Sequence, residues 1–298
     1  MLSINIPVYN IEIGDLVLAI LVQAEKLDCK YEIRIYDDGS DGVVKVKNRK
    51  FSGHSNIIYY ELKENLGRAA IRNKMGFDSI FKYLLFIDAD SKPISENYLE
   101  NYLQNIKPNC VLCGGTWYQQ TKPAEADKLL RWVYGTKREA VSAEIRNSNK
   151  GFIITSNNFL IEKEIFSKFH FRGNIKMYGH EDTLLGYDLF KNGIKILHID
   201  NRLEHTGLEA GRVFLEKTRI ALKNLYFISN ELLDGDGQFL DQVYFLNKFV
   251  KITRIIPALI FRVFYRATRF LMEKNLTGKR PQLFFFDLYK IGYYSTLK

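Results

Sequence analysis

The chain has 298 residues, of which 46% are hydrophobic and 26% charged, with 6 Pro and no low-complexity segment. This composition excludes a disordered or fibrous chain, and three cysteines are too few for a disulfide framework. The net charge of +9 is uneven, because residues 206–298 hold 15 Lys and Arg against 8 Asp and Glu. A basic tail on a nearly neutral body predicts contact with an anionic surface and argues against a protein that coats nucleic acid.

The first 120 residues alternate apolar, β-rich runs with amphipathic runs. We predict strands over 3–7, 31–36, 57–62, 83–87 and 111–116, and helices over 11–26, 67–81 and 96–106. Short, almost continuous apolar strands separated by helices are typical of a parallel sheet with helices on both faces. The pattern therefore predicts a doubly wound α/β fold, in which ligands bind at the carboxyl ends of the strands.

The rest of the chain gives a mixed pattern and then a helical one. We predict helices over 124–147 and 181–191, two short strands over 151–161, and a strand pair over 195–204 that is broken near Asp200. After His205 the strand signals end and helical periodicity continues to the last residue. We therefore place a domain boundary near residue 206, with an α/β domain over 1–206 and a helical, basic region over 207–298.

Three of the predicted strands end in segments that carry polar side chains: Pro7-Val8-Tyr9-Asn10, Asp37-Asp38-Gly39-Ser40 and Asp88-Ala89-Asp90. Because carboxyl ends of parallel strands meet at one edge of a sheet, we expect these groups in one crevice. Asp88 and Asp90 are two residues apart, so both can point to the same side. Carboxylates together with phosphate oxygens are the ligands that Mg²⁺ or Mn²⁺ prefers. The alternatives are a simple turn at residues 37–40 and a solvated acidic loop at 88–90.

Three later segments add candidate functional groups. Arg68 and Arg72 lie four apart on one face of the predicted helix over 67–81, where Asn65 is placed to cap the first turn. Glu181 and Asp182 open another helix, although acids are favoured at helix starts without any further role. His205 ends the last predicted strand and, as a neutral imidazole, would complete a metal site with Asp90, although a lone histidine is more often structural.

Together these segments resemble the inverting GT-A glycosyltransferases of family 2. The motifs occur in the family's order: SINIPVYN, IYDDGSDG, ENLGRAAIRN, LLFIDAD, TSNNFLI, YGHEDTLLGYDL and a late histidine. The resemblance covers about residues 1–206. It implies a mixed, mostly parallel sheet with helices on both faces, followed by a helical extension. It also implies an enzyme that transfers a sugar from a UDP-sugar with the aid of Mn²⁺ or Mg²⁺.

The resemblance implies roles for residues on the donor side of the site. Pro7, Tyr9 and Asp38 would line the uracil pocket, with Asp38 accepting a hydrogen bond from the base. Arg72 would lie near the base, and Arg68 would also contact the donor nucleotide.

The same resemblance implies the metal and catalytic residues. Asp88 would face the ribose or a metal-bound water, and Asp90 and His205 would ligate the metal. Asp182 would be the catalytic base, and Glu181 would orient the acceptor or the start of the helix. Residues 155–158 match the strand that floors the donor-sugar pocket.

The sequence departs from the processive relatives of this family. These carry a Q-x-x-R-W motif after the E-D helix, whereas Arg131-Trp132 precedes that helix here and Lys128 stands at the position of the glutamine. We therefore expect one sugar to be added per encounter, to a saccharide or lipid-linked acceptor. The alternatives are a nucleotidyltransferase that forms sugar nucleotides, whose glycine-rich N-terminal loop is missing, and a basic protein that binds nucleic acid or membranes without catalysis.

The segment over 251–272 predicts an amphipathic helix that Pro257 kinks or splits. Its cationic stripe lies opposite an apolar, aromatic one, which is typical of a helix in a membrane interface. The three arginines at 262, 266 and 269 argue against a membrane-spanning helix. With no signal peptide expected, we predict a cytoplasmic protein bound peripherally to the inner face of the plasma membrane. The alternative is that the apolar stripe packs on the catalytic domain.

Overall fold

The computed structural model describes residues 1–148, 152–175 and 177–297, and these form two compact units. We refer to them as unit 1 and unit 2. Unit 1 comprises Met1–Trp117, Val141–Lys176 and Glu181–Gly207, and unit 2 comprises Tyr118–Ala140, Met177–His180 and Leu208–Lys298.

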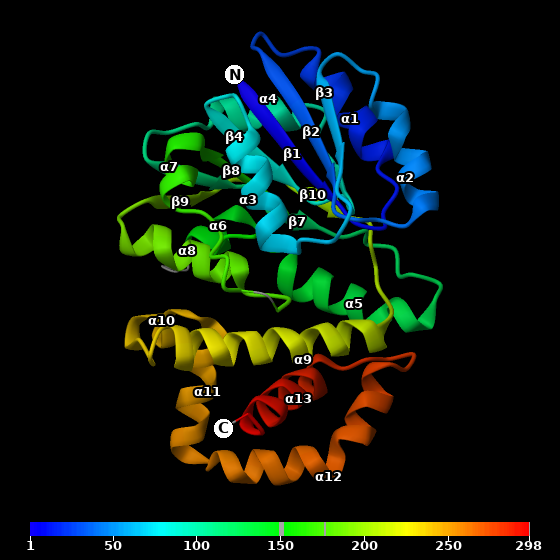
Figure 1. Ribbon diagram of the computed structural model, residues 1–298. Helices are drawn as coiled ribbons and strands as arrows, with labels where there is room; N and C mark the ends of the chain where they lie inside the picture. Colours follow the sequence, from blue (N-terminus) through cyan, green and yellow to red (C-terminus); the bar gives the residue numbers. More distant parts are fainter. Residues whose placement is uncertain (149–151, 176, 298) are drawn as a thin grey trace. The chain divides into compact units, whose positions relative to one another are not determined.

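The main sheet of unit 1 has seven strands among the described residues, in the order β3-β2-β1-β4-β8-β6-β9 (Figure 1). The strands are β1 Leu2–Val8, β2 Tyr31–Asp37, β3 Ile57–Glu61, β4 Tyr83–Ile87, β6 Cys110–Cys113, β8 Asn158–Glu162 and β9 Lys195–His198. Of these, β8 alone runs antiparallel to its neighbours. The mixed, mostly parallel sheet predicted from the sequence is therefore confirmed.

Helices cover both faces of this sheet, as predicted. One face packs against α1 Gly14–Ala24 and α4 Tyr98–Gln104, and the other against α3 Arg68–Asp78, α7 Lys163–Lys168 and α8 Glu181–Lys191. The alternation of side chains along a strand produces this arrangement. In β4, Leu85 and Ile87 join the first core, whereas Leu84 and Phe86 join the second.

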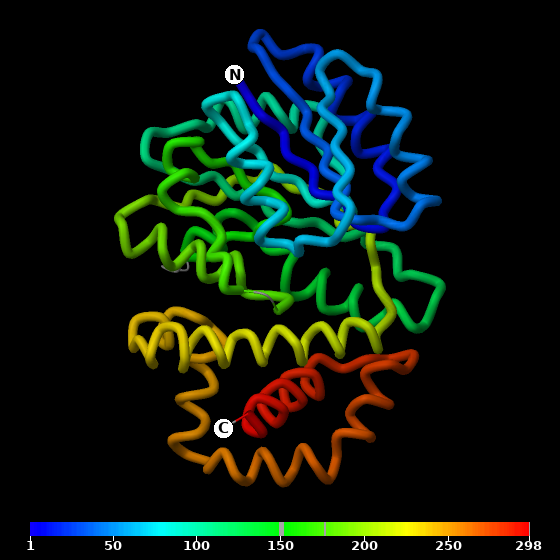
Figure 2. Tube along the Cα trace, in the orientation of Figure 1, coloured from blue at the N-terminus to red at the C-terminus, as the bar shows by residue number. Residues whose placement is uncertain are grey.

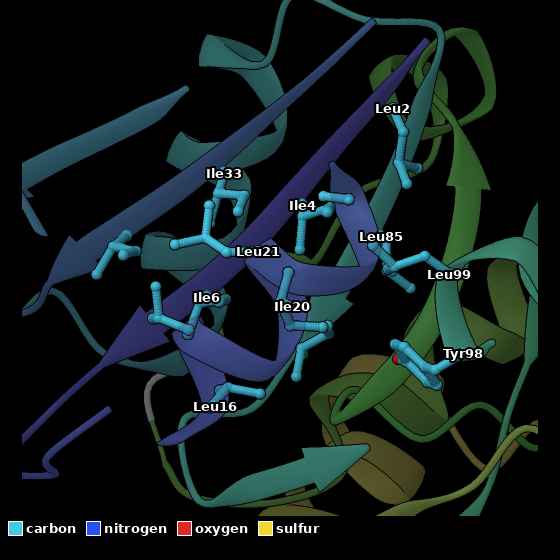
Figure 3. Packing of buried hydrophobic residues seen from close by; sticks show 14 of the residues in the cluster. Leu2, Ile4, Ile6, Leu16, Ile20, Leu21, Ile33, Leu85, Tyr98 and Leu99 are labelled. Atoms are coloured by element: carbon cyan, nitrogen blue, oxygen red, sulfur yellow. The ribbon is translucent and has the colours of Figure 1, made fainter. Parts of the chain in front are cut away.

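The core on the first face is built around β1. Its residues Leu2, Ile4 and Ile6 belong to one cluster of buried side chains with Leu16 and Ile20 of α1 (Figure 3). Each such side chain contributes roughly 1.5–3 kcal/mol when fully buried. This packing holds β1, and with it the segment that follows Val8, at the edge where β2 and β4 also end.

A second, small sheet completes unit 1. It consists of β5 Ser91–Pro93, β10 Leu203–His205 and β7 Thr116–Trp117, in that order. The sequence predicted one strand over 111–116, but Gly114 and Gly115 divide it into β6 and β7. Gly115 has a φ of +85°, and the guanidinium of Arg146 occupies the space where a Cβ would lie. The chain therefore leaves one sheet and enters the other at these glycines.

Of the two strands predicted over 151–161, the described residues contain only the second. Residue 151 lies outside the described residues, and 152–157 contain no strand, whereas β8 begins at Asn158. The side-chain amide of buried Asn158 donates to the carbonyl oxygens of Gly115 and Asn201, at 2.8 and 2.9 Å. Tertiary hydrogen bonds, rather than a second strand, thus fix the chain just before β8.

Unit 2 is helical in its described residues. Its α-helices are α5 Leu129–Tyr134, α9 Gly211–Phe227, α10 Gly237–Gln242, α11 Tyr244–Ile255, α12 Ala258–Leu276 and α13 Leu283–Ser295. Within unit 2, α13 lies between α9 and α12 (Figure 2). Pro257 separates α11 from α12, as predicted. In the part of the chain that the structure describes, none of the helices combines the length and the apolar character that crossing a bilayer requires.

Candidate active site

The acidic residues after β4 and the histidine of β10 come together in unit 1. Strand β5 begins at Ser91, directly after Asp90, and pairs antiparallel with β10 so that Ser91 lies opposite His205. This register places Nε2 of His205 3.5 Å from Oδ2 of Asp90. The backbone N–H and the hydroxyl of Thr206 both donate to the carbonyl oxygen of Asp90, at 2.8 and 2.9 Å. The small sheet therefore unites two candidate metal ligands that are distant in sequence.

Asp90 and His205 fit a divalent cation as a partial ligand set. Two adjacent ligands of an octahedral Mg²⁺ lie about 3 Å apart, close to the separation observed here. Among residues 1–148, 152–175 and 177–297, no cluster of three or more His, Cys, Asp or Glu side chains is arranged to hold a metal. Phosphate oxygens and water would have to supply the remaining ligands, as is usual for Mg²⁺ bound with a nucleotide. Burial raises the pKa of Asp90, against the opposing effect of His205.

Asp88 faces two arginines of α3. Arg72 forms an ion pair through Nη2 with Oδ1 of Asp88, and Nη2 of Arg68 lies 3.4 Å from Oδ2. Burial opposes ionisation of Asp88, but these guanidinium groups outweigh it, so the pKa of Asp88 is lowered. Arg72 is buried and also donates to the carbonyl oxygen of Arg68 at 3.0 Å. Its guanidinium is thus committed to Asp88, a contact that the sequence did not reveal.

Asp38 fixes the start of α3. Its two carboxylate oxygens accept the backbone N–H groups of Leu66 and Gly67, at 2.7 and 3.1 Å. Asn65 was predicted to cap this helix, but the N-cap is Gly67, with a φ of +87°, and the Asn65 amide donates to the carbonyl oxygen of Asp38 instead. Burial raises the pKa of Asp38, although the two N–H groups partly offset it. The carboxylate thereby sets the position from which Arg68 projects.

Two further residues of the predicted donor site lie at the same edge of the sheet. Pro7 belongs to β1, and Tyr9 follows it with an exposed ring. The carbonyl oxygen of Val8 accepts the N–H of Asp38 at 2.7 Å, which ties the end of β1 to the end of β2. The contact of these residues with a base stays a prediction.

The acidic pair at the start of α8 is linked to the arginines. Nε of Arg68 lies 2.9 Å from Oε1 of Glu181, so Arg68 bridges Glu181 and Asp88. The two guanidinium groups of α3 outweigh burial and lower the pKa of Glu181. Asp182 accepts the N–H of Thr183 at 2.7 Å through Oδ1 and that of Ser156 at 3.4 Å through Oδ2.

The environment of Asp182 suits proton transfer. Burial, and then the neighbouring charge of Glu181, raise the pKa of Asp182 to about 6, against the lowering effects of Arg68 and of two backbone N–H groups. A carboxylate with such a pKa is ionised at neutral pH yet basic enough to accept a proton in a transition state.

Residues 155–158 lie beside these groups. The hydroxyl of Ser156 accepts from Nη2 of Arg68 at 3.5 Å, and the amide of Asn157 donates to Oγ1 of Thr116 at 3.0 Å. Behind them, the hydroxyls of Tyr98 and Tyr102 both donate to Oδ1 of Asn158 at 2.7 Å. The sequence assigned this segment to the site only by resemblance, and the buried contacts of Asn158 hold its last residue in place.

Gly207 is a site residue that we did not predict. A Cβ at this position would lie 2.8 Å from Oδ2 of Asp90, closer than a side chain and a carboxylate oxygen can approach. Glycine is therefore needed for the chain after β10 to pass Asp90. The signal in the sequence was a glycine two residues after the candidate histidine.

Comparison with known proteins gives the family of the chain. The sequence profile described as glycosyl transferase family 2 matches residues 3–169, more than half of the chain. No protein in a search of curated sequences matches it.

Solved structures share the fold. The S. aureus TarS fragment 1–349 superposes with a TM-score of 0.56 and 17% identity, over 99% of this chain and 89% of that one. The mannosyltransferase PcManGT from Pyrobaculum calidifontis gives a TM-score of 0.61 and 12% identity, over 97% and 85%. For the longer TarS structure, with 18% identity and a TM-score of 0.52, the match covers 77% of this chain and 40% of that one. The chain therefore belongs to glycosyl transferase family 2 and is a glycosyltransferase with the GT-A fold.

Proposed function

We propose that the protein is an inverting, non-processive glycosyltransferase. It would transfer a sugar from a UDP-sugar to a hydroxyl of a saccharide or lipid-linked acceptor, in the synthesis of cell-surface polysaccharide or glycolipid. The observation that carries the proposal is the meeting of Asp90 with His205, 3.5 Å apart, at the edge of the sheet where Arg68 joins Asp88 to Glu181. A nucleotide-sugar donor is supported by the complexes of TarS with UDP-GlcNAc and of PcManGT with GDP-Man and Mn²⁺.

The donor would bind along the carboxyl edge of the sheet. Pro7 and Tyr9 would contact the uracil ring, and Asp38 would accept a hydrogen bond from it. Arg68 would contact the diphosphate, since its guanidinium already spans two acidic groups beside the candidate metal ligands. Asp90 and His205 would hold Mn²⁺ or Mg²⁺, which neutralises the negative charge that develops on the departing diphosphate.

Asp182 would act as the base. Its carboxylate accepts the proton of the acceptor hydroxyl while that oxygen forms a bond to the anomeric carbon of the donor. The bond between the anomeric carbon and the diphosphate oxygen breaks, and UDP leaves with the electron pair. A single displacement inverts the anomeric centre, so an α-linked donor gives a β-linked product. Glu181, held by Arg68 at 2.9 Å, would keep the start of α8 in place during this step.

The direct test is a screen for UDP release. The purified protein is incubated with Mn²⁺ and a panel of UDP-sugars, with and without a crude lipid and glycan extract as acceptor. We expect one UDP-sugar to give UDP release that requires both the metal and the extract, because the proposed base needs an acceptor hydroxyl. If no UDP-sugar in the panel is turned over under any of these conditions, the proposal is wrong.

We also propose that α12 attaches the enzyme to the cytoplasmic face of the plasma membrane. Its side towards α13 is buried through Tyr265 and Met272, whereas Val263, Phe270 and Leu271 on another side are exposed. Exposed arginines adjoin this apolar surface, at positions 266 and 269. An apolar helix face flanked by arginines matches a bilayer that carries anionic lipids.

Replacing both Phe270 and Leu271 with serine should weaken binding to vesicles that contain phosphatidylserine by about tenfold or more. Burial of even one large apolar side chain is worth roughly 1.5–3 kcal/mol, and flotation of the vesicles measures the bound fraction. The matched control replaces Val43 and Val46 of α2 Gly42–Asn48, which are 71% and 66% exposed against 73% and 66% for the tested pair. Equal binding of wild type and Phe270→Ser/Leu271→Ser would exclude α12 as the attachment site.

A further inference from the structure

In unit 1, two neighbouring strands of the main sheet continue together into the small sheet. The strands β6 and β9 are parallel, and Cys113 lies opposite His198 at their ends. Residues 114–115 then lead from β6 to β7, and residues 199–202 lead from β9 to β10. We refer to these two stretches as the linking segments. They stay paired, because the N–H of Asn201 donates to the carbonyl oxygen of Gly114 at 3.2 Å.

Arg146 lies on α6 Ala143–Ser148 and contacts both linking segments. Its Nη1 donates to the carbonyl oxygen of Cys113, the last residue of β6, at 3.2 Å. Its Nη2 donates to the carbonyl oxygens of Gly114 and Ile199, at 3.2 and 2.9 Å. One planar guanidinium therefore fixes the spacing between the two linking segments.

The remaining donors of this guanidinium are also used. Nε donates to the carbonyl oxygen of Val141 at 3.2 Å, and Nη1 lies 3.1 Å from Nδ1 of His198. Because a guanidinium can only donate, Nδ1 of His198 accepts. Burial, and then the charge of Arg146, lower the pKa of this imidazole to about 4, so it is neutral at physiological pH. Arg146 thus has an acceptor for each of its five N–H groups.

Main-chain carbonyls, rather than an ion pair, decide where this guanidinium lies. Oδ1 of Asp200 is 4.0 Å from Nη2 of Arg146, beyond hydrogen-bonding distance. The side chain of Arg146 is only 10% exposed, and burial lowers its pKa. A buried charge is weak evidence for a contribution to stability, because desolvation offsets its interactions. A rigid fork of donors instead suits a group that sets the distance between two pieces of backbone.

The residue after Arg146 attaches α6 to the edge strand β9. Nδ2 of Asn147 donates to the carbonyl oxygen of His198 at 2.8 Å, and Oδ1 of Asn147 accepts the N–H of His198 at 2.9 Å. Because β9 is the last strand in the order of the main sheet, this amide pairs with it as a neighbouring strand would. Arg146 is therefore carried by a helix that is itself fixed to the sheet (Figure 1).

The linking segment over 199–202 leads directly to a candidate metal ligand. Leu203 of β10 pairs with Thr116 of β7, and His205 follows in the same strand. The separation of 3.5 Å between His205 and Asp90 thus depends on where β10 leaves the linking segment. Groups of a binding site must be held within about 0.5 Å of the productive geometry. A shift of this segment by more than that amount would take His205 away from a cation bound to Asp90.

We propose that Arg146 is a positioning residue for the candidate metal site. It holds the two linking segments at a fixed spacing, and through β10 it sets the separation of His205 from Asp90. This inference rests on the proposed function, because it assumes that these two side chains bind the metal together with the diphosphate. Arg146 acts through the backbone and not on the donor. Its loss should therefore weaken the metal-dependent part of donor binding and leave the metal-independent part unchanged.

The first test measures how UDP binding depends on Mn²⁺. Arg146→Met removes all five donors and keeps the length of the side chain. Calorimetry in Mn²⁺ should show UDP binding at least about tenfold weaker than in the wild type, since loss of an outer-shell partner costs about 10–100-fold in metal affinity. Calorimetry without Mn²⁺ should show no difference from the wild type.

The matched control is Arg34→Met in β2. The side chain of Arg34 is 7% exposed, against 10% for Arg146, and it donates to Glu32 and Tyr36. This variant also loses a buried guanidinium, but these contacts of Arg34 lie within β2 and not in the small sheet. We expect its UDP binding in Mn²⁺ to equal that of the wild type.

A second pair of variants keeps the test decisive if Arg146→Met does not fold. Arg146→Lys keeps the positive charge but replaces the fork by three donors on one atom. Pulsed EPR of the Mn²⁺–UDP complex reports the ligand directly, because an imidazole nitrogen bound to Mn²⁺ gives a hyperfine coupling. We expect this coupling in the wild type and in Arg34→Lys, and its loss in Arg146→Lys. A change in stability alone would leave the coupling of the folded protein as it is.

The outcomes separate this inference from the function on which it rests. If the wild type shows no Mn²⁺-dependent UDP binding or no nitrogen coupling, the proposed metal site fails, and the role of Arg146 fails with it. If the wild type shows both, and either one is unchanged in the Arg146 variants, Arg146 is not a positioning residue and the proposed function stands. Equal losses in the Arg34 variants would likewise overturn the inference, because they would show a general effect of losing a buried guanidinium.

Discussion

Asp182→Asn should lower kcat for sugar transfer by about 10²–10⁴-fold, the usual contribution of general base catalysis. The amide cannot accept a proton from the acceptor, but it keeps the shape of the side chain and its acceptance of the Thr183 N–H. Binding of UDP and Mn²⁺ should be retained, since the donor contacts proposed above do not involve Asp182. UDP release at saturating donor measures kcat, and calorimetry measures the binding of UDP and Mn²⁺.

The matched control is Asp188→Asn in the same helix. Asp188 pairs with Arg172 at 2.5 Å and takes no part in the proposed chemistry, so this variant should transfer sugar at close to the wild-type rate. Near-normal kcat in Asp182→Asn would remove Asp182 from the role of base. Equal losses in both variants would indicate a general effect on α8 instead.

The pH dependence of kcat independently tests the role of Asp182 as the base. Because burial and Glu181 raise the pKa of Asp182 to about 6, half of the molecules have a protonated base at that pH. Below it, the rate should fall about tenfold for each pH unit, and above it the rate should reach a plateau. Arg68 and Glu181 are the charged groups that act on this carboxylate, so the midpoint should move upward in Arg68→Gln. A rate that is constant from pH 5 to 8 would contradict the assignment.

Asp90→Ala should reduce Mn²⁺-dependent binding of UDP by at least about 100-fold. Loss of even an outer-shell partner of a metal costs about 10–100-fold in metal affinity, and Asp90 is proposed as a direct ligand. The variant also leaves His205 without the carboxylate that lies 3.5 Å away. Calorimetric titration of UDP with and without Mn²⁺ separates the metal-dependent part of the affinity.

Glu204→Ala is the control for this experiment. Glu204 precedes His205 in β10, and its side chain points to the opposite side of the strand. Glu204→Ala therefore removes one negative charge near the site without removing a proposed ligand. If Asp90→Ala binds UDP in Mn²⁺ as tightly as Glu204→Ala does, Asp90 is not a metal ligand.

Much of the fold could be predicted because the strands of unit 1 are buried on both faces. Residues 83–87 form an unbroken apolar run in the sequence, and in the structure they belong alternately to the two cores. The start of β8 could not be predicted in this way. It depends on hydrogen bonds of Asn158 to Gly115 and Asn201, which are far from it in sequence and leave no periodic signal.

Part of the candidate site could likewise be predicted from the sequence, and part could not. The acids that follow β2 and β4 were predicted, because strand order alone brings their ends to one edge. The bridge from Arg68 to Glu181 was not, since 113 residues separate the partners and each has an ordinary role at a helix start. The domain boundary near residue 206 stays a prediction.

The pairing of β5 with β10 has a consequence for how the protein is assembled. Asp90 and His205 meet only when the late strand β10 has taken its place beside β5, and an unfolded chain would hold these two side chains far apart. A divalent cation would therefore bind the native protein more tightly than the unfolded chain, and its binding would shift the folding equilibrium towards the native state. The same ion that assists departure of the diphosphate would then also stabilise the pairing of β5 with β10 in the small sheet.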